Sequence, residues 1–340
     1  MDTIANMYRS LIKTNKWKYY DFPHQTSNYN EIFCKSFIVA YLGQGNKTEA
    51  PIFKYIESLD EYRIKHIISC FFLGIVVYEK NVTIQKNIDF FLEKLPSYRE
   101  ESNKDRFLYI WMLISIFHDF GYAVEEKMIE INNDEFDSLL EQMPNYPKGV
   151  PKLYDKHLLK NYNGYKCCRF CCYDHGIIGG IRLYSDLCKL REEKEQYDYD
   201  NKQYWKKDLE NDFSIAAWAI ACHNIFYLEE SSKYVRCYER FGIEKLVYQG
   251  EARNINLIRH PIFYLLCLVD SIEPLKTRHD VSILNEVKID ISAEKIEINL
   301  EEMKCPCKKT MYSEKTISLK DWLTDVEESD DMLIIHLKTK

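Results

Sequence analysis

The feature that most constrains the folding of this chain of 340 residues is a series of histidines and aspartates that begin or end apolar runs. In chain order the series is His66, His118, Asp119, His175, His223 and Asp270. A polar side chain that enters an apolar core needs a partner there, because burying it unpaired costs free energy. We therefore expect the apolar runs to be helices that gather these side chains into a shared polar site.

Four imidazoles and two carboxylates exceed the ordinary coordination of one ion, whereas they suit two divalent metals bridged by a short carboxylate. Each residue also has a structural interpretation when it is taken alone. A single histidine in an apolar helix, such as His66 or His223, is usually a satisfied core residue, and Asp270 could cap the turn that follows it. The doublet His118-Asp119 is harder to explain in this way, because a buried carboxylate must be paired or metal-bound.

The short sequence motifs around these residues resemble those of a known family. FHDFGY, DHGIIGG and LLCLVDSIEP occur in this order, and together they resemble the HD-domain superfamily of helical metal-dependent phosphohydrolases, specifically its binuclear branch. The resemblance covers roughly residues 55 to 280. The chain departs from the family twice, since it lacks the HHExxDGxGYP segment of the HD-GYP phosphodiesterases and carries Tyr122 where many members have Lys. Neither a cyclic-di-GMP substrate nor a mechanism that uses that Lys is therefore supported.

The resemblance implies a mainly α fold, an HD-domain helical bundle, and two divalent metal ions, with Asp119 as the bridging ligand. The ligands implied for the first metal are His66, His118, Asp119 and Asp270. Those implied for the second are Asp119, His175 and His223. Imidazole-rich ligation favours iron, manganese or zinc over magnesium. The implied reaction is hydrolysis of a phosphoester, with a nucleotide as the expected substrate, by a hydroxide that the two metals activate at the His118-Asp119 doublet.

Two other functions fit the same ligand series. A few HD proteins, such as inositol oxygenase, use this set to hold two irons and activate dioxygen, and the spacing does not separate them from hydrolases. The chain could also be a non-catalytic module that binds a nucleotide and signals through its C-terminal part. Iron content and dioxygen consumption would identify the first alternative, and tight nucleotide binding without hydrolysis would identify the second.

Further polar residues are candidates for supporting or substrate-binding roles. Asp174 precedes His175 and could cap its helix or support the ligand, whereas Tyr122 could stack on a base and His260 could cap a helix or contact substrate. Possible phosphate-binding cations are Arg63, Lys127, Arg169 and Arg182.

Twelve cysteines raise the question of a second metal site. The cluster Cys167, Cys168, Cys171 and Cys172 has CxxC spacing, and with Cys305 and Cys307 it could bind zinc. The simpler interpretation is a group of reduced thiols in a cytoplasmic protein.

Apolar periodicity predicts helices through most of the chain. The expected helices cover residues 58–80, 82–95, 105–119, 175–196 and 214–225, and a further one begins at Pro261 and carries Asp270. Gly176, Gly179 and Gly180 disfavour a helix, and we expect close approach of another helix or of the metals to compensate. Residues 125–165 are polar and predict a lid or surface excursion.

We therefore expect a mixed helical and loop segment over residues 1–54 and an HD domain over residues 55–280. A small α+β appendage follows over residues 281–340, with two or three strands and a helix at LKDWLTDVEES. The apolar runs are shorter than the roughly 20 residues of a membrane helix, and the N-terminus lacks a secretory pattern. A net charge of −7 without a basic tract argues against duplex nucleic acid as a partner. We expect a cytoplasmic protein that acts on a small-molecule phosphoester, without a membrane partner.

Overall fold

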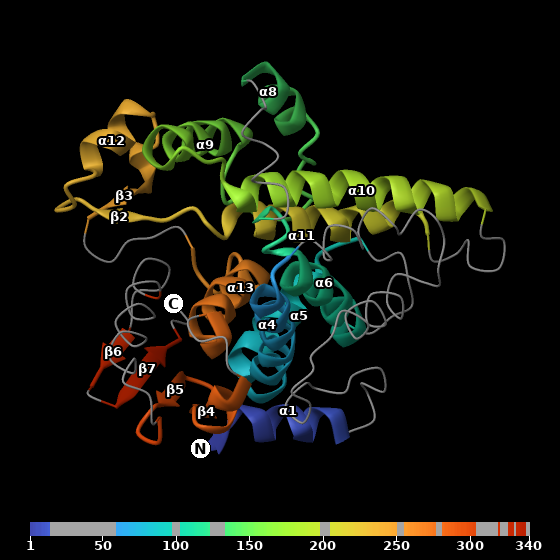
Figure 1. The fold of residues 1–340 in the computed structure, drawn as a ribbon. Helices are drawn as coiled ribbons and strands as arrows, with labels where there is room; N and C mark the ends of the chain where they lie inside the picture. The colour runs from blue at the N-terminus through green and yellow to red at the C-terminus, as the bar shows by residue number, and fades with distance from the viewer. Residues whose placement is uncertain are drawn as a thin grey trace. The chain divides into compact units, whose positions relative to one another are not determined.

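Helices supply most of the regular structure in the computed structural model, which is drawn as a ribbon in Figure 1. The structure describes residues 1–13, 59–96, 103–122, 133–197, 205–249, 255–276, 281–303, 319, 326–329 and 331–337. The chain forms two compact units. The first contains Met1–Asn87 and Cys267–Lys340, and the second contains Ile88–Leu266. The predicted mainly α class and the predicted small sheet near the C-terminus are both confirmed.

The helices of the first unit are α1 (Ile4–Lys13) and α4 (Glu61–Lys80), with the beginning of α5 (Val82–Glu93) and the end of α13 (Pro261–Ile272). The Tyr8 hydroxyl of α1 donates to the carbonyl oxygen of Ser69 on α4 at 3.0 Å. The predicted helix over residues 58–80 is confirmed. It begins after Asp60, whose side chain makes no capping hydrogen bond, while the predicted cap Ser58 lies outside the described residues.

A five-stranded antiparallel sheet completes this unit, in the order β1-β4-β5-β7-β6. Its strands are β1 (Asp2–Thr3), β4 (Lys288–Ile291), β5 (Lys295–Asn299), β6 (Val326–Glu328) and β7 (Met332–His336). Ile296 pairs with Ile335 across β5 and β7, and both side chains are buried on one face, as the alternating pattern predicts. Two features differ from the prediction: the first residues of the chain contribute an edge strand, and the end of the expected helix at LKDWLTDVEES is strand β6.

The second unit contains the helices α6 (Asn103–Phe117), α8 (Asn133–Glu141), α9 (Lys156–Phe170), α10 (His175–Tyr197), α11 (Glu210–Cys222) and α12 (Val235–Arg240). A short parallel pair joins β2 (Leu228–Glu229) to β3 (Val247–Tyr248). Helix α11 packs against both α10 and α6, and α10 and α11 lie side by side in Figure 1. An added Cβ at Gly180 would lie 2.4 Å from the carbonyl oxygen of Ala217, so glycine permits this close approach, as predicted.

The polar segment 125–165 differs from the predicted surface excursion. Residues 123–132 lie outside the described residues, but α8 and α9 occupy much of the remainder. Asp155 caps the start of helix α9, and its carboxylate accepts a hydrogen bond from the Leu158 backbone N–H at 2.7 Å. Leu158, Leu159 and Tyr162 are buried. Their spacing forms one helical face, and the surrounding polar residues obscured that pattern in the sequence.

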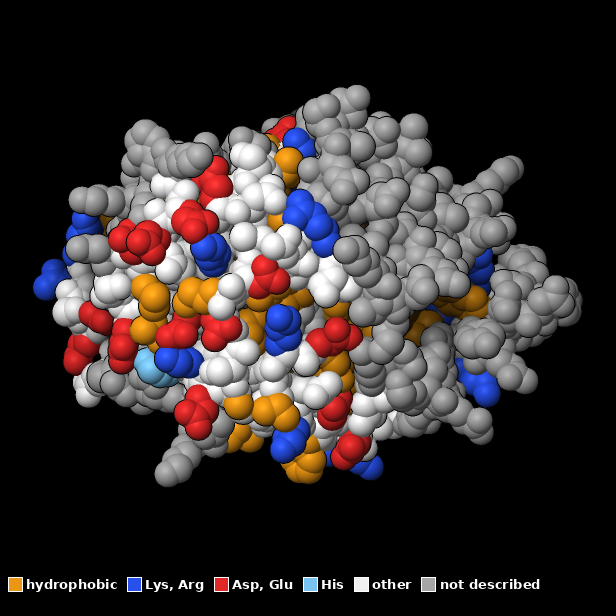
Figure 2. Space-filling model, turned by 90° about the horizontal axis from the view of Figure 1, so that it is seen from below, with side chains coloured by type: hydrophobic (Ala, Val, Ile, Leu, Met, Phe, Trp, Pro, Cys, Tyr) orange, Lys and Arg blue, Asp and Glu red, His pale blue; other side chains and the backbone are white. Residues whose placement is uncertain are grey.

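No single described helix is long and apolar enough to cross a membrane, and α4 and α5 pass that test only as a pair bent by 97°. On the face seen in Figure 2, acidic and basic side chains of the described residues are interspersed rather than grouped by sign.

Candidate metal centre

The HD doublet lies in a turn that follows α6 in the second unit. The Nδ1–H of His118 donates to the carbonyl oxygen of Ser115 at 2.8 Å, and its Nε2 lies 3.6 Å from Asp119 Oδ1. Two residues later, an added Cβ at Gly121 would lie 1.8 Å from the carbonyl oxygen of His175. Glycine is therefore required for the turn to contact the first residue of α10, and this contact brings Asp119 close to His175.

Asp174 positions the start of α10. Its Oδ1 accepts a hydrogen bond from the Ile177 backbone N–H at 3.0 Å, which confirms the predicted capping role. Its Oδ2 accepts a second hydrogen bond from Asn224 Nδ2 at 2.7 Å. Tyr122 stacks on the His175 ring with a centroid distance of 3.8 Å. Asp174 therefore positions the helix that begins with His175, and Tyr122 covers one face of the His175 ring.

His223 follows the last residue of α11 and meets the His175 side chain. Its Nδ1–H donates to the carbonyl oxygen of Ile220 at 2.6 Å, while its Nε2 lies 3.2 Å from His175 Nε2. The ligand atoms of Asp119, His175 and His223 all lie within 4.8 Å of one another, and all three residues are buried. The ring of His118 is 5.4 Å from that of His223. The second unit therefore brings together every predicted ligand that it contains.

The hydrogen bonds of this group indicate which nitrogens would bind a cation. Because Nδ1 of His118 and Nδ1 of His223 each donate to a carbonyl, Nε2 is the atom of each neutral ring that carries the lone pair. The Nε2 lone pair of His223 faces another imidazole nitrogen at 3.2 Å, so a proton or a cation is needed between the two. Histidines that bind metals commonly have the other nitrogen fixed by a carbonyl or carboxylate in this manner.

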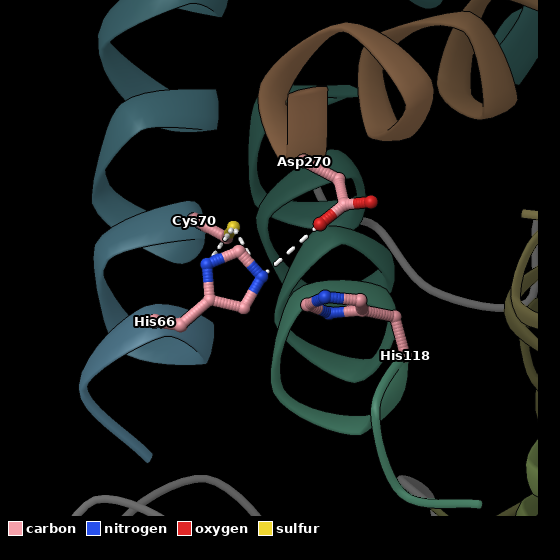
Figure 3. Close-up of side chains that lie close together, drawn as sticks. All are labelled: His66, Cys70, His118 and Asp270. Carbon is pink, nitrogen blue, oxygen red and sulfur yellow. Dashed lines mark hydrogen bonds and ion pairs between the residues drawn. The ribbon is translucent and has the colours of Figure 1, made fainter. Parts of the chain in front are cut away.

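The first unit contains a second group of potential ligands, shown in Figure 3. His66 Nε2 on α4 lies 3.0 Å from Asp270 Oδ1 on α13. Cys70, one turn after His66, places its Sγ 3.7 Å from both ring nitrogens of that histidine. His118, labelled in the same figure, belongs to the second unit and is described with it above.

Glu273 is a participant in this group that the sequence analysis did not identify. Its Oε2 accepts a hydrogen bond from His66 Nδ1 at 2.6 Å, and its side chain is fully buried. The backbone N–H groups of Leu275 and Lys276 both donate to its carboxylate at 3.0 Å. A signal was present in the sequence, because Glu273 directly follows the end of α13 and lies three residues, about one helical turn, after Asp270.

These carboxylates favour positive charge at His66. Burial lowers the pKa of His66, but Cys70, Asp270 and Glu273 together raise it well above its usual range. Burial raises the pKa of the Cys70 thiol to about 12. Lys276 Nζ lies 2.6 Å from Asp270 Oδ2 and forms an ion pair with that carboxylate. A bound cation could replace the proton on His66 Nε2, since Glu273 already fixes the other nitrogen.

The remaining candidates do not belong to either group of potential ligands among the described residues. Arg182 lies two turns beyond His175 on α10, and its Nε has no hydrogen-bond partner among the described residues. Arg169 lies beside Tyr234 and Arg63 lies over the Tyr62 ring, while Lys127 lies outside the described residues. His260 lines an apolar pocket.

The cysteine cluster gives no second metal site among the described residues. Cys167 and Cys168 belong to α9, and Cys171 ends that helix in a left-handed conformation with φ of 55°. The described groups that could hold an ion include none of these thiols. Cys305 and Cys307, their predicted partners, lie outside the described residues.

Comparison of the chain with models of protein families, with curated proteins and with solved structures gives no match.

Proposed function

We propose that this protein is a metal-dependent phosphohydrolase of the HD type, in which two divalent ions act on a phosphoester, with a nucleotide as the expected substrate. The ligands of the first ion are His66, His118, Asp119 and Asp270. The ligands of the second ion are Asp119, His175 and His223. The assignment of both sets to one binuclear centre bridged by Asp119 rests on the resemblance of the sequence to HD-domain enzymes.

The observation that carries the proposal is the arrangement of Asp119, His175 and His223. They come from three separate segments, yet their ligand atoms lie within 4.8 Å of one another in a buried environment. One carboxylate and two imidazoles are a typical ligand set for a transition metal. The backbone carbonyl that receives the Nδ1–H of His223 leaves Nε2 as the ligating atom.

The His66 group supports the first ion in the same way. His66 Nε2 and Asp270 Oδ1 lie 3.0 Å apart, and Glu273 receives a hydrogen bond from Nδ1 of the same ring. The neighbouring Cys70 sulfur adds a soft donor, and soft donors favour iron or zinc over magnesium. Two such ions would supply a nucleophilic hydroxide at neutral pH and neutralise charge on the phosphate.

The surrounding residues orient this chemistry. Asp174 and Asn224 position the start of α10, and Tyr122 covers one face of the His175 ring. The tyrosine could also stack on a base, as aromatic side chains do. The absence of any disulfide between described cysteines is compatible with the cytoplasmic location that we include in the proposal.

The test is a hydrolysis assay on the full chain. We would add Mn²⁺, Fe²⁺ or Zn²⁺ singly and assay bis(p-nitrophenyl) phosphate together with cyclic and linear nucleotides. We expect metal-dependent hydrolysis that His223→Ala lowers on the order of 100-fold or more, since loss of even a supporting residue costs 10–100-fold. The control His157→Ala, at an exposed position of α9, should retain full activity.

Hydrolysis that is absent with every metal would contradict the proposal. Iron-dependent dioxygen consumption without hydrolysis would replace it with the oxygenase alternative.

A further inference from the structure

An apolar pocket lies on one face of α11, within the second unit. The helix contributes Ile215, Trp218, Ala219 and Cys222, whose spacing defines a single face. The neighbouring face of α11, at Ala217 and Ile220, meets α10 at its glycines. The pocket and the His175 ligand therefore approach α11 from different sides, so the pocket is distinct from the candidate metal centre.

Aromatic side chains form the wall of this pocket. The ring of Tyr146 stacks on Trp218 with a centroid distance of 4.1 Å. Trp218 Nε1 donates to the carbonyl oxygen of Pro144 at 2.9 Å, and the Tyr146 hydroxyl accepts from the Tyr154 backbone N–H at 3.3 Å. Because backbone groups satisfy both polar ends, the two rings present apolar surface to the pocket.

His260 is the exception in this lining. Its side chain lines the pocket, its residue is only 7% exposed, and it carries the only imidazole among the described residues of the lining. Burial and the neighbouring Arg259 lower the pKa of His260 to about 4, so the ring is neutral at pH 7 and offers one donor and one acceptor.

The size and charge of the pocket restrict what it can hold. The space that the centre of a water molecule could occupy is about 40 Å³. One water needs about 10–15 Å³ on that measure, so there is room for roughly three waters or one six-membered ring. No charged side chain of the described residues lines the pocket. A phosphate is therefore a poor ligand, because its charge would be buried without a partner.

We propose that this pocket binds a small uncharged aromatic molecule that carries one hydroxyl or N–H group. Its ring packs against the face of α11 formed by Trp218 and Ala219, and its polar hydrogen is donated to the imidazole of His260. This site is separate from the proposed phosphoester chemistry, and its occupancy does not depend on a metal.

The test compares phenol with toluene, which has the same size but no hydrogen-bond donor, by calorimetric titration of the full chain. We expect saturable one-to-one binding of phenol. A net hydrogen bond of about 1 kcal/mol corresponds to roughly a fivefold change in affinity. His260→Leu should therefore lower the ratio of phenol affinity to toluene affinity by about five- to tenfold, while toluene binding persists. Ala219→Trp should abolish binding of both molecules by filling the pocket, and the exposed control His157→Leu should leave both unchanged.

Circular dichroism would verify that each variant is folded. If His260→Leu does not fold, the unaltered chain still provides a test, because phenol must then bind at least as tightly as the more hydrophobic toluene. Absence of saturable phenol binding, binding that survives Ala219→Trp, or an affinity ratio that is equal in the wild type and in His260→Leu would overturn the proposal.

Discussion

His175 and His223 direct their Nε2 atoms toward one another across 3.2 Å, although the Nδ1–H of His223 is already donated to a backbone carbonyl. Two imidazole nitrogens at that separation need a proton or a cation between them. The carboxylate of Asp119, close to both rings, favours the cation electrostatically.

Metal binding should stabilise the folded chain. An ion that binds the folded state alone adds about 2.7 kcal/mol to the free energy of unfolding at a concentration of 100 times its Kd. We therefore expect Mn²⁺ or Zn²⁺ to raise the Tm of chelator-treated protein. The rise should shrink in His175→Ala with His223→Ala, and calorimetry would measure it. If no metal changes the Tm, the assignment is contradicted.

Glu273→Gln tests the supporting carboxylate at His66. The amide no longer stabilises positive charge on the imidazole, and loss of such a partner typically lowers metal affinity 10–100-fold. We expect this decrease for one of the two ions, measured by competition with a chromogenic chelator. Glu294→Gln, an exposed position between β4 and β5, is the matched control and should bind both ions normally. Equal affinities in the two variants would rule out this role for Glu273.

Gly121→Ala tests the contact between the HD turn and α10. The added Cβ would lie 1.8 Å from the His175 carbonyl oxygen, so the backbone must shift, at a cost of about 1–3 kcal/mol. We expect a lower free energy of unfolding in urea and weaker metal binding. Gly164→Ala is the control, because its Cβ would meet Phe241 at an ordinary 3.6 Å within helix α9. That change should stabilise the chain by about 0.5–1 kcal/mol. If Gly121→Ala leaves both the free energy of unfolding and the metal affinity unchanged, the close contact is not required.

His260 should give the stability a recognisable pH dependence. Its folded pKa is about 4, below an unfolded value near 6.5. The unfolded chain therefore binds the proton more readily. The stabilisation from the neutral ring is fully present above pH 6.5 and is lost as the pH falls toward 4, with a limit of about 3 kcal/mol. Urea unfolding of the wild type and His260→Gln between pH 7 and 4 would measure the difference. If the free energy of unfolding changes equally with pH in the wild type and in His260→Gln, the folded chain does not bury a neutral imidazole at this position.

The sequence predicted the helices that carry the ligands because each ligand interrupts a strongly apolar run. It also predicted that a close approach to another helix or to the metals explains Gly180 in α10, and the neighbour is the backbone of α11. It did not predict Glu273, whose partner His66 is distant in sequence. Helix α9 was missed because its buried face is masked by many polar neighbours, and β1 because a two-residue strand has no periodicity of its own.

The most direct test of the central claim is the metal content of the full chain, purified without chelator or added metal and measured by mass spectrometry. We expect about two transition-metal ions per chain. One should remain in His175→Ala with His223→Ala, one should remain in His66→Ala with Asp270→Ala, and both should be lost in His118→Ala with Asp119→Ala. One ion or none in the wild type, or zinc that survives all three double substitutions, would contradict the binuclear centre. Surviving zinc would instead indicate the thiols at Cys167, Cys168, Cys171 and Cys172.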